Sequence, residues 1–330
     1  MDRIISVIIP AYNIAPWIRR CLDSVLAQTH QNLEVIAVND GSTDDTAAIL
    51  DNYAAKDCRM KVIHKENGGV TSARLRGVAE ATGQWIGFVD GDDYVEPDMY
   101  ERLLKNALEA DADISHCGYR MILPSGRVDH YYNTGNKVEQ NCLQGLQDLL
   151  EGRFVEPGLW NKLYKKELFA QLEEKMDSRI RINEDLLMNY YLFAKADKAI
   201  FEDFCPYHYM VRNGSAASAP INEHKLMDPI RVTYQIMEQA PRELDIVLQA
   251  KLARQLIMLA SMPVKESPDW MRHCLIWGRT ELKDRLPQLL SADISAKWKV
   301  LTLWAAVWPG SYGWVHRTYS KISGKDKRYQ

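Results

Sequence analysis

Short apolar runs and amphipathic segments alternate along the first part of the chain. Residues 4–9 form a continuous apolar run rich in β-branched side chains, typical of a strand buried on both faces of a parallel sheet. Residues 14–26 then repeat apolar side chains at helical spacing. The same alternation predicts strands at 33–38, 60–64 and 84–89 and helices at 42–53 and 70–83. Strands separated by helices in this way predict right-handed βαβ units and an open, mostly parallel α/β sheet flanked by helices.

The pattern is less regular after residue 97. It predicts a helix at 99–110, a strand at 114–119 leading into a hairpin, and a mixed segment at 199–211. Residues 225–330 are expected to be mainly helical. We therefore predict two regions: a domain at 1–220, with a nucleotide-binding half at 1–95 and an acceptor half at 96–220, and a helical C-terminal region at 221–330.

Composition narrows the class of protein. With 330 residues, 46% hydrophobic and 26% charged, the chain is expected to be an ordinary soluble globular protein. A net charge of -3 means that the chain has no overall excess of positive charge to attract nucleic acid, so no nucleic-acid partner is expected. The six cysteines form no CxxC pair, which favours a reducing cytoplasm over a disulfide framework. No signal-peptide pattern or long apolar run occurs, so neither secretion nor membrane spanning is expected.

Polar residues follow the predicted strands where each strand ends. The fourth strand runs directly into Asp90, Asp92 and Asp93, and carboxylates this close repel one another unless a cation or hydrogen-bond donors hold their charge. In open parallel sheets, ligands bind beyond this carboxyl edge. The chain has no GxG and no GxxxxGK(S/T), which argues against a dinucleotide fold and a phosphate-binding loop. A divalent cation on Asp90 and Asp92 is the natural substitute for a glycine cradle around a diphosphate.

Seven segments together resemble the motifs of one enzyme family. They are SVIIPAYN (6–13), VNDGSTDDT (38–46), NGGVTSARLRG (67–77), FVDGDD (88–93), WNKLYKKELF (160–169), NEDLLMNYYLF (183–193) and YMVRNGSAAS (209–218). Their content and order are similar to family 2 glycosyltransferases with the GT-A fold, over residues 4–220. Within that family the chain is similar to bacterial enzymes that build surface polysaccharide or lipopolysaccharide.

The resemblance implies a nucleotide site and a metal site. The nucleotide site would consist of Pro10, Tyr12, Asn13, Asp40, Arg74, Asp90, Gly91, Arg212 and Ser215. Tyr12 would lie against uracil, Asp40 would accept from base or ribose, and Arg74 would contact the base side. Arg212 and Ser215 match a loop that closes on the diphosphate. Asp92 would bind Mn²⁺ or Mg²⁺ directly, Asp90 would face ribose and metal, and His208 is a candidate further ligand.

The resemblance also implies the catalytic residues. Asp185 matches the general base, with Glu184 beside it. One base opposite one leaving group implies a single displacement with inversion. A positioned base contributes about 10² to 10⁴ in rate.

Several of these residues also have purely structural interpretations. Glu184 and Asp185 open a predicted helix, where they complement its dipole. His208 is more often a packed histidine than a ligand. Asp93, like Asp44, is expected to cap a helix or to be solvated. Trp160 and Lys162 are read either as lining an acceptor cleft or as a core tryptophan and a surface lysine.

The expected function is metal-dependent, inverting transfer from a nucleotide-sugar, expected to be UDP-linked, to a glycan or lipid-linked saccharide in bacterial envelope synthesis. Two alternatives remain. A sugar nucleotidyltransferase would need a glycine-rich turn containing arginine after the first strand, which is absent. A non-catalytic nucleotide-sugar-binding module would need no base, so Asp185 argues against it.

The end of the chain suggests a location. Residues 297–330 carry seven Lys or Arg against one Asp, and four of the nine tryptophans. Basic and aromatic residues together suit an anionic membrane surface, here the cytoplasmic face of the inner membrane. A terminal helix that covers the core or a dimer face explains them equally well, which leaves homo-oligomer formation open.

Overall fold

The computed structural model describes residues 3–131, 134–212 and 220–323. The chain forms two compact units. The first comprises Met1–Ser178 and Glu184–Arg212, and the second comprises Arg179–Asn183 and Asn213–Gln330. Each unit is described by itself.

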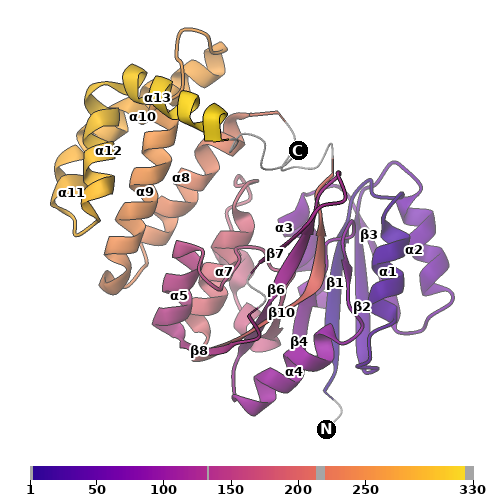
Figure 1. Ribbon diagram of the computed structural model, residues 1–330. Helices are drawn as coiled ribbons and strands as arrows, with labels where there is room; N and C mark the ends of the chain where they lie inside the picture. Colours follow the sequence, from indigo (N-terminus) through magenta and orange to yellow (C-terminus); the bar gives the residue numbers. More distant parts are fainter. Residues whose placement is uncertain (1–2, 132–133, 213–219, 324–330) are drawn as a thin grey trace. The chain divides into compact units, whose positions relative to one another are not determined.

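The first unit is built on one large sheet (Figure 1). Its strands are β1 (Ile5–Ala11), β2 (Leu33–Asp40), β3 (Met60–Lys65), β4 (Trp85–Phe88), β5 (Tyr94–Val95), β6 (Ile114–Ile122), β7 (Val128–Tyr131), β8 (Lys137–Asn141), β9 (Lys162–Lys165) and β10 (Lys198–Met210). Its helices are α1 (Ile18–Leu26), α2 (Thr46–Ala54), α3 (Val70–Glu80), α4 (Met99–Glu109), α5 (Cys142–Glu151), α6 (Leu172–Lys175) and α7 (Glu184–Lys195), with a short 3-10 helix, η1 (Lys166–Phe169).

The strand order is β3-β2-β1-β4-β9-β6-β10-β5, with β7 beside β6 and β8 beside β10. The first four strands pair in parallel, which confirms the predicted βαβ half. Strand β9 was not predicted. It pairs antiparallel with both β4 and β6, and it thereby joins the two halves into one sheet. Its four residues begin and end with lysine, so they carry no apolar run that would have indicated a strand.

Helices cover both faces of the parallel half (Figure 1). Alternate residues of β1 point to opposite faces. Val7 and Ile9 belong to a core cluster with the apolar residues of α1 and α4. On the other face Ile8 meets α3, where a Cβ on Gly77 would lie 2.5 Å from Ile8 Cγ2. Glycine at this position therefore permits close packing of helix on strand.

The second unit is helical in its described part, as the sequence predicted. Its helices are α8 (Glu223–Met237), η2 (Arg242–Leu244), α9 (Asp245–Ala260), α10 (Asp269–Asp284), α11 (Leu286–Ser291), α12 (Ala296–Val307) and α13 (Pro309–Ser323). They share a separate core that includes Leu252, Leu259 and Leu275. Gly278 of α10 lets the backbone approach Leu259 of α9. Within the described residues, no helix is both long enough and apolar enough to cross a bilayer.

Candidate active site

The parallel strands bring the predicted nucleotide residues to one edge. Ala11 pairs with Asn39, and Ile8 pairs with Phe88, so β1, β2 and β4 end near one another. Pro10 is the next-to-last residue of β1, and Asn13 follows the strand. Asn13 links two of the loops at this edge, because its amide donates to Ser42 Oγ at 3.1 Å and its side-chain oxygen accepts from Thr43 N at 2.8 Å.

Tyr12 and Asp40 lie at this edge in different surroundings. Tyr12 is 50% exposed, so its ring is open to a ligand. Asp40 is buried and accepts from Lys65 Nζ at 2.5 Å, from Gly68 N at 3.0 Å and from Gly69 N at 2.8 Å. Asp40 therefore shapes the loop that opens α3, and its contact with a base or ribose stays a prediction.

The turn after β4 is tightly constrained. A Cβ on Gly91 would lie 2.3 Å from Ile14 Cδ1, so any larger residue there would displace the Ile14 side chain. Asp90 Oδ1 accepts from Arg74 Nη2 at 3.0 Å, and Asp92 Oδ2 accepts from Arg212 Nε at 2.5 Å. Each of the two predicted metal-binding carboxylates is thus paired with an arginine.

Asp93 differs from both of its expected roles, capping and solvation. Its side chain is buried and accepts from Tyr207 OH at 2.7 Å and from Met210 N at 2.8 Å. The same Tyr207 hydroxyl accepts from Asp90 N at 3.1 Å. Asp93 therefore ties the turn to β10. Sequence reasoning missed this role because the donors come from a strand far along the chain.

The carboxylates at this edge fit a divalent cation whose other ligands are substrate phosphates and water. Asp92 is about a fifth exposed, with a side-chain value of 21%, and Arg212 Nε donates to its Oδ2. Mg²⁺ usually takes one or two carboxylates together with substrate phosphates and water. Across residues 3–131, 134–212 and 220–323, no group of three or more His, Cys, Asp or Glu side chains is placed to hold a metal. The site therefore suits a metal that arrives with a diphosphate rather than a preformed metal cage.

His208 is engaged by protein groups. Its Nε2 lies 2.7 Å from Glu96 Oε1 and 3.3 Å from Arg120 Nη1, and its ring stacks on Tyr94 with centroids 4.1 Å apart. Burial lowers the pKa of His208, against the raising effect of Glu96. It belongs to no described metal-ligand cluster, so the structural interpretation fits its surroundings.

Arg74 connects the turn after β4 to α7. Its guanidinium is buried, with Nη2 3.0 Å from Asp90 Oδ1 and Nη1 3.6 Å from Glu184 Oε1. Burial would lower the pKa of Arg74, but Asp90 and Glu184 raise it above its usual value. The resemblance had placed this arginine toward the base of the nucleotide. In the structure it lies between Asp90 and Glu184, a pairing that was not predicted.

The first turn of α7 carries both predicted catalytic residues. Asp185 Oδ1 accepts from the amide of Leu186 at 2.8 Å. Burial, and next the Asp185 charge, raise the pKa of Glu184 to about 8, although Arg74 opposes the rise. Burial also raises the pKa of Asp185, which Arg74 partly offsets. Two adjacent carboxyls of this kind titrate as a coupled pair, so their pKa values belong to the pair and not to either residue alone.

Trp160 and Lys162 are both buried, so the surface-lysine interpretation is wrong. Lys162 is fully buried at the start of β9, and this burial was not predicted. Trp160 stacks on Tyr207 with centroids 4.3 Å apart. The only signal of this burial would have been apolar surroundings on both sides of a short lysine-rich segment. Other strands supply those surroundings, so the local sequence does not show them. Ser215 lies outside the described residues.

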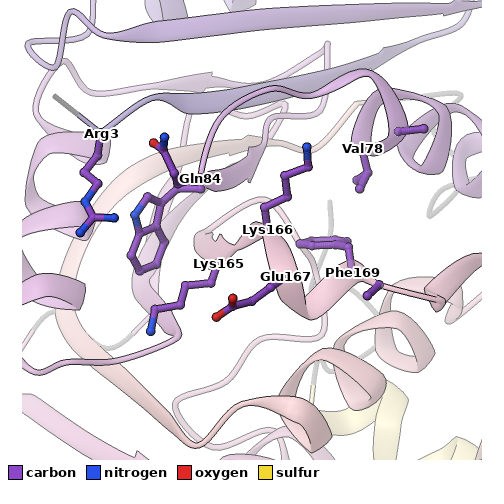
Figure 2. Close-up of a pocket in the computed structure, with 10 residues that line it drawn as sticks. Arg3, Val78, Gln84, Lys165, Lys166, Glu167 and Phe169 are labelled. Atoms are coloured by element: carbon purple, nitrogen blue, oxygen red, sulfur yellow. The ribbon is translucent and has the colours of Figure 1, made fainter.

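A cavity of about 660 Å³ lies at the opposite edge of the sheet (Figure 2). It is lined by Arg3, Val78, Ala79, Gln84, Trp85, Lys165, Lys166, Glu167, Phe169 and Ala170. Trp85 begins β4, whereas Asp90 follows the end of that strand. The cavity therefore does not contain the candidate catalytic residues.

Comparison with known proteins identifies the family. Residues 6–173 match the model of glycosyl transferase family 2. The chain belongs to this family. It is 36% identical to the uncharacterized glycosyltransferase EpsJ of Bacillus subtilis (strain 168) over 67% of this chain and 64% of EpsJ. It is 29% identical to glycosyltransferase GlyA of Streptococcus pneumoniae over 98% of this chain and 46% of GlyA. The chain thus spans about half to two thirds of the length of these relatives.

The fold has solved counterparts. S. aureus TarS 1–349, in complex with UDP-GlcNAc, superposes with a TM-score of 0.74 at 21% identity, covering 96% of this chain and 91% of TarS 1–349. This family 2 glycosyltransferase domain therefore has the GT-A fold, with a helical C-terminal region. The family match ends before α7, so the assignments of Asp185, His208 and Arg212 rest on geometry and on the motifs around them.

Proposed function

We propose that this glycosyltransferase transfers a sugar, with inversion, from a UDP-sugar to a hydroxyl group of a glycan or lipid-linked saccharide in bacterial envelope polysaccharide synthesis. One observation carries the proposal: Arg74 links Asp90 of the β4 turn to Glu184 of α7. This link supports the proposal, because it brings a residue assigned to the leaving-group side and one assigned to the base side into one cluster. TarS, a protein with the same fold, has been solved with UDP-GlcNAc and with UDP, which supports the choice of donor.

The residues divide the chemistry between them. Asp92 and Asp90 would hold Mn²⁺ or Mg²⁺, which, when bound, neutralises charge developing on the diphosphate. Arg212, paired with Asp92 at 2.5 Å, would turn to the phosphates. Asp185 would take the proton of the acceptor hydroxyl as its oxygen bonds to the anomeric carbon and the bond to UDP breaks.

Turnover of a UDP-sugar panel tests this function directly. The protein is incubated with each UDP-sugar, Mn²⁺ and an envelope lipid extract, and UDP release is measured with and without EDTA. We expect release that depends on metal. Metal-dependent UDP binding without release would favour the non-catalytic alternative. Synthesis of UTP when pyrophosphate is added would favour the nucleotidyltransferase.

We also propose that α12 and α13 contact the cytoplasmic face of an anionic membrane. Val300, Leu303 and Val307 lie on one face of α12, and their exposed fractions are 63%, 45% and 49%. Trp308, which follows α12, and Trp314 of α13 are 65% and 64% exposed. Aromatic and apolar side chains beside lysines are typical of segments that lie in a membrane interface.

Liposome co-sedimentation tests the membrane contact. We expect binding to vesicles containing phosphatidylglycerol, and loss of most binding in the double variant Trp308→Ala/Trp314→Ala. Trp270→Ala, on α10 of the same unit, is the control. Equal binding by the double variant and the wild type would contradict the proposal. A concentration-dependent dimer that the double variant abolishes would assign the same surface to a homo-oligomer instead.

A further inference from the structure

A buried lysine binds a loop that also contacts α7, the helix of the candidate base. Lys162 is 0% exposed, and its ammonium donates to three oxygens: Glu156 O at 2.6 Å, Gly158 O at 2.6 Å and Asn161 Oδ1 at 2.8 Å. An ammonium has three donors, so all of them are used. The three hydrogen-bond donors of the ammonium are therefore all bound to neutral oxygens.

The charge of Lys162 is not neutralised by direct contact. In the described parts of the chain, no carboxylate lies within 4.0 Å of its Nζ. A buried cation without a contacting anion projects its field onto the nearest carboxylates, because little water screens it. Such a charge is costly to bury, so its retention calls for a physical reason.

The loop that Lys162 binds is also held by α7. Asn189 Nδ2 donates to Pro157 O and lies 3.4 Å from Gly158 O, the same carbonyl that accepts from Lys162. Asn189 is four residues after Asp185, so the two side chains lie on one face of α7. Lys162 and α7, the helix that carries Asp185, therefore contact the same short loop, Glu156 to Gly158.

We propose that Lys162 is a positioning residue for Asp185: its ammonium anchors the Glu156 to Gly158 loop against α7, and its positive charge keeps the Asp185 carboxylate ionised. The inference rests on the proposed function, in which Asp185 is the base. The electrostatic effects of the neighbouring groups on Lys162 agree with this proposal. Burial lowers the pKa of Lys162 to about 8, and Glu156 opposes this change first, followed by Cys117 and Asp185.

The electrostatic surroundings of Asp185 show why this charge is needed. The groups that act on it, or on which it acts, are Arg74, Asp90, Glu184, Glu156, Lys162, Tyr164 and Tyr209. The anionic ones favour its protonated form, and Arg74 is shared with Asp90 and Glu184. Lys162 is the cation of this set that forms no ion pair with another carboxylate.

The pH profile of turnover separates this role from loop anchoring. For the UDP-sugar that the wild type turns over, kcat/KM is measured from about pH 5 to about pH 9. Loss of the positive charge favours protonated Asp185. In Lys162→Met we therefore expect the acid limb of the kcat/KM profile to move up by about one pH unit, which corresponds to about a tenfold loss of rate on that limb. Lys162→Arg keeps the charge and is expected to keep the wild-type limb. Lys105→Met, on the exposed face of α4, is the matched control.

Asn189→Ala gives the contrasting result for pure anchoring. It loosens the same loop without removing a charge, so kcat should fall while the acid limb stays in place. An unshifted limb in Lys162→Met would overturn the proposal. If Lys162→Met does not fold, Lys162→Arg decides: a limb displaced by a full unit despite the retained charge would overturn it. An inactive wild type would instead refute the proposed function.

Discussion

The two sides of the candidate active site hold their charges differently. At the β4 turn, Asp92 and Arg212 form an ion pair in which both side chains remain about a fifth to a quarter exposed, at 21% and 24%. Around α7, Arg74 is 6% exposed and Glu184 14% exposed at the side chain, and Lys162 is fully buried. One side faces solvent and the other is enclosed.

This difference matches two chemical tasks. A partly exposed ion pair is worth little, about 0–1 kcal/mol, so Arg212 can leave Asp92 when a metal diphosphate arrives. Buried charges cannot be exchanged at low cost, and they set the protonation of their neighbours instead. The leaving-group side is thus suited to ligand exchange, and the base side is suited to fixed electrostatics.

Asp185→Asn is expected to give the largest effect. Removing the base should lower transfer by about 10² to 10⁴, while donor binding at the β4 turn persists. Single-turnover transfer and UDP binding by calorimetry check the two parts. Asp197→Asn, exposed beyond the other end of α7, is the control. An Asp185→Asn enzyme with near wild-type turnover would exclude Asp185 as the base.

Asp92→Asn is expected to act on the exposed side alone. Loss of a carboxylate ligand should weaken Mn²⁺-dependent UDP binding on the order of 10- to 100-fold. Calorimetric titration of UDP with and without Mn²⁺ measures this. Asp129→Asn, on exposed β7, should bind as the wild type does. If both variants kept wild-type affinity, the metal would have to bind elsewhere.

Glu184→Gln sharpens the account of the enclosed side. The folded state raises the pKa of Glu184 from its ordinary value of 4.5 to about 8. Between these values the folded protein holds a proton that the unfolded chain releases, so the free energy of unfolding falls as pH rises. In the variant, this decrease in the free energy of unfolding should be smaller by at least about 1 kcal/mol, the equivalent of one pKa unit.

Urea unfolding between about pH 5 and about pH 8 measures that slope. Glu80→Gln is the control, because hydrogen bonding to Lys61 lowers the pKa of the exposed Glu80. Removing the Glu80 carboxyl should not flatten the decrease of the free energy of unfolding with pH. An unchanged slope in Glu184→Gln would mean that this carboxyl is ionised in the folded protein.

Asp44→Ala is expected to give the smallest effect and none on chemistry. Asp44 accepts from Thr46 N, at the start of α2, at 3.0 Å and from Ala15 N at 3.1 Å, so backbone amides hold it although the N-cap residue of α2 is Asp45. Its loss should cost about 1 kcal/mol of stability. Thermal melting and the transfer assay measure the two quantities. A marked loss of transfer in a stable Asp44→Ala protein would add Asp44 to the site.

Local pattern predicted the parallel half of the fold and its polar edge. The two-residue and 3.6-residue periods are properties of neighbouring residues, so they show in the sequence of β1 or α1 without any knowledge of the partner. Resemblance of motifs then added the family and the candidate residues. It did not indicate that Arg74 would join Asp90 to Glu184, because those residues meet only after the sheet forms.

The sequence by itself determined the alternation of strands and helices and the carboxylates at the end of β4, since both follow from short-range spacing. Only the tertiary structure decided that β9 enters the sheet antiparallel, that Asp93 is tied to β10 and that Lys162 is buried. The physical reason is that burial and charge pairing depend on which distant segments pack together. A lysine has the same sequence signature whether its ammonium lies in water or in the protein interior.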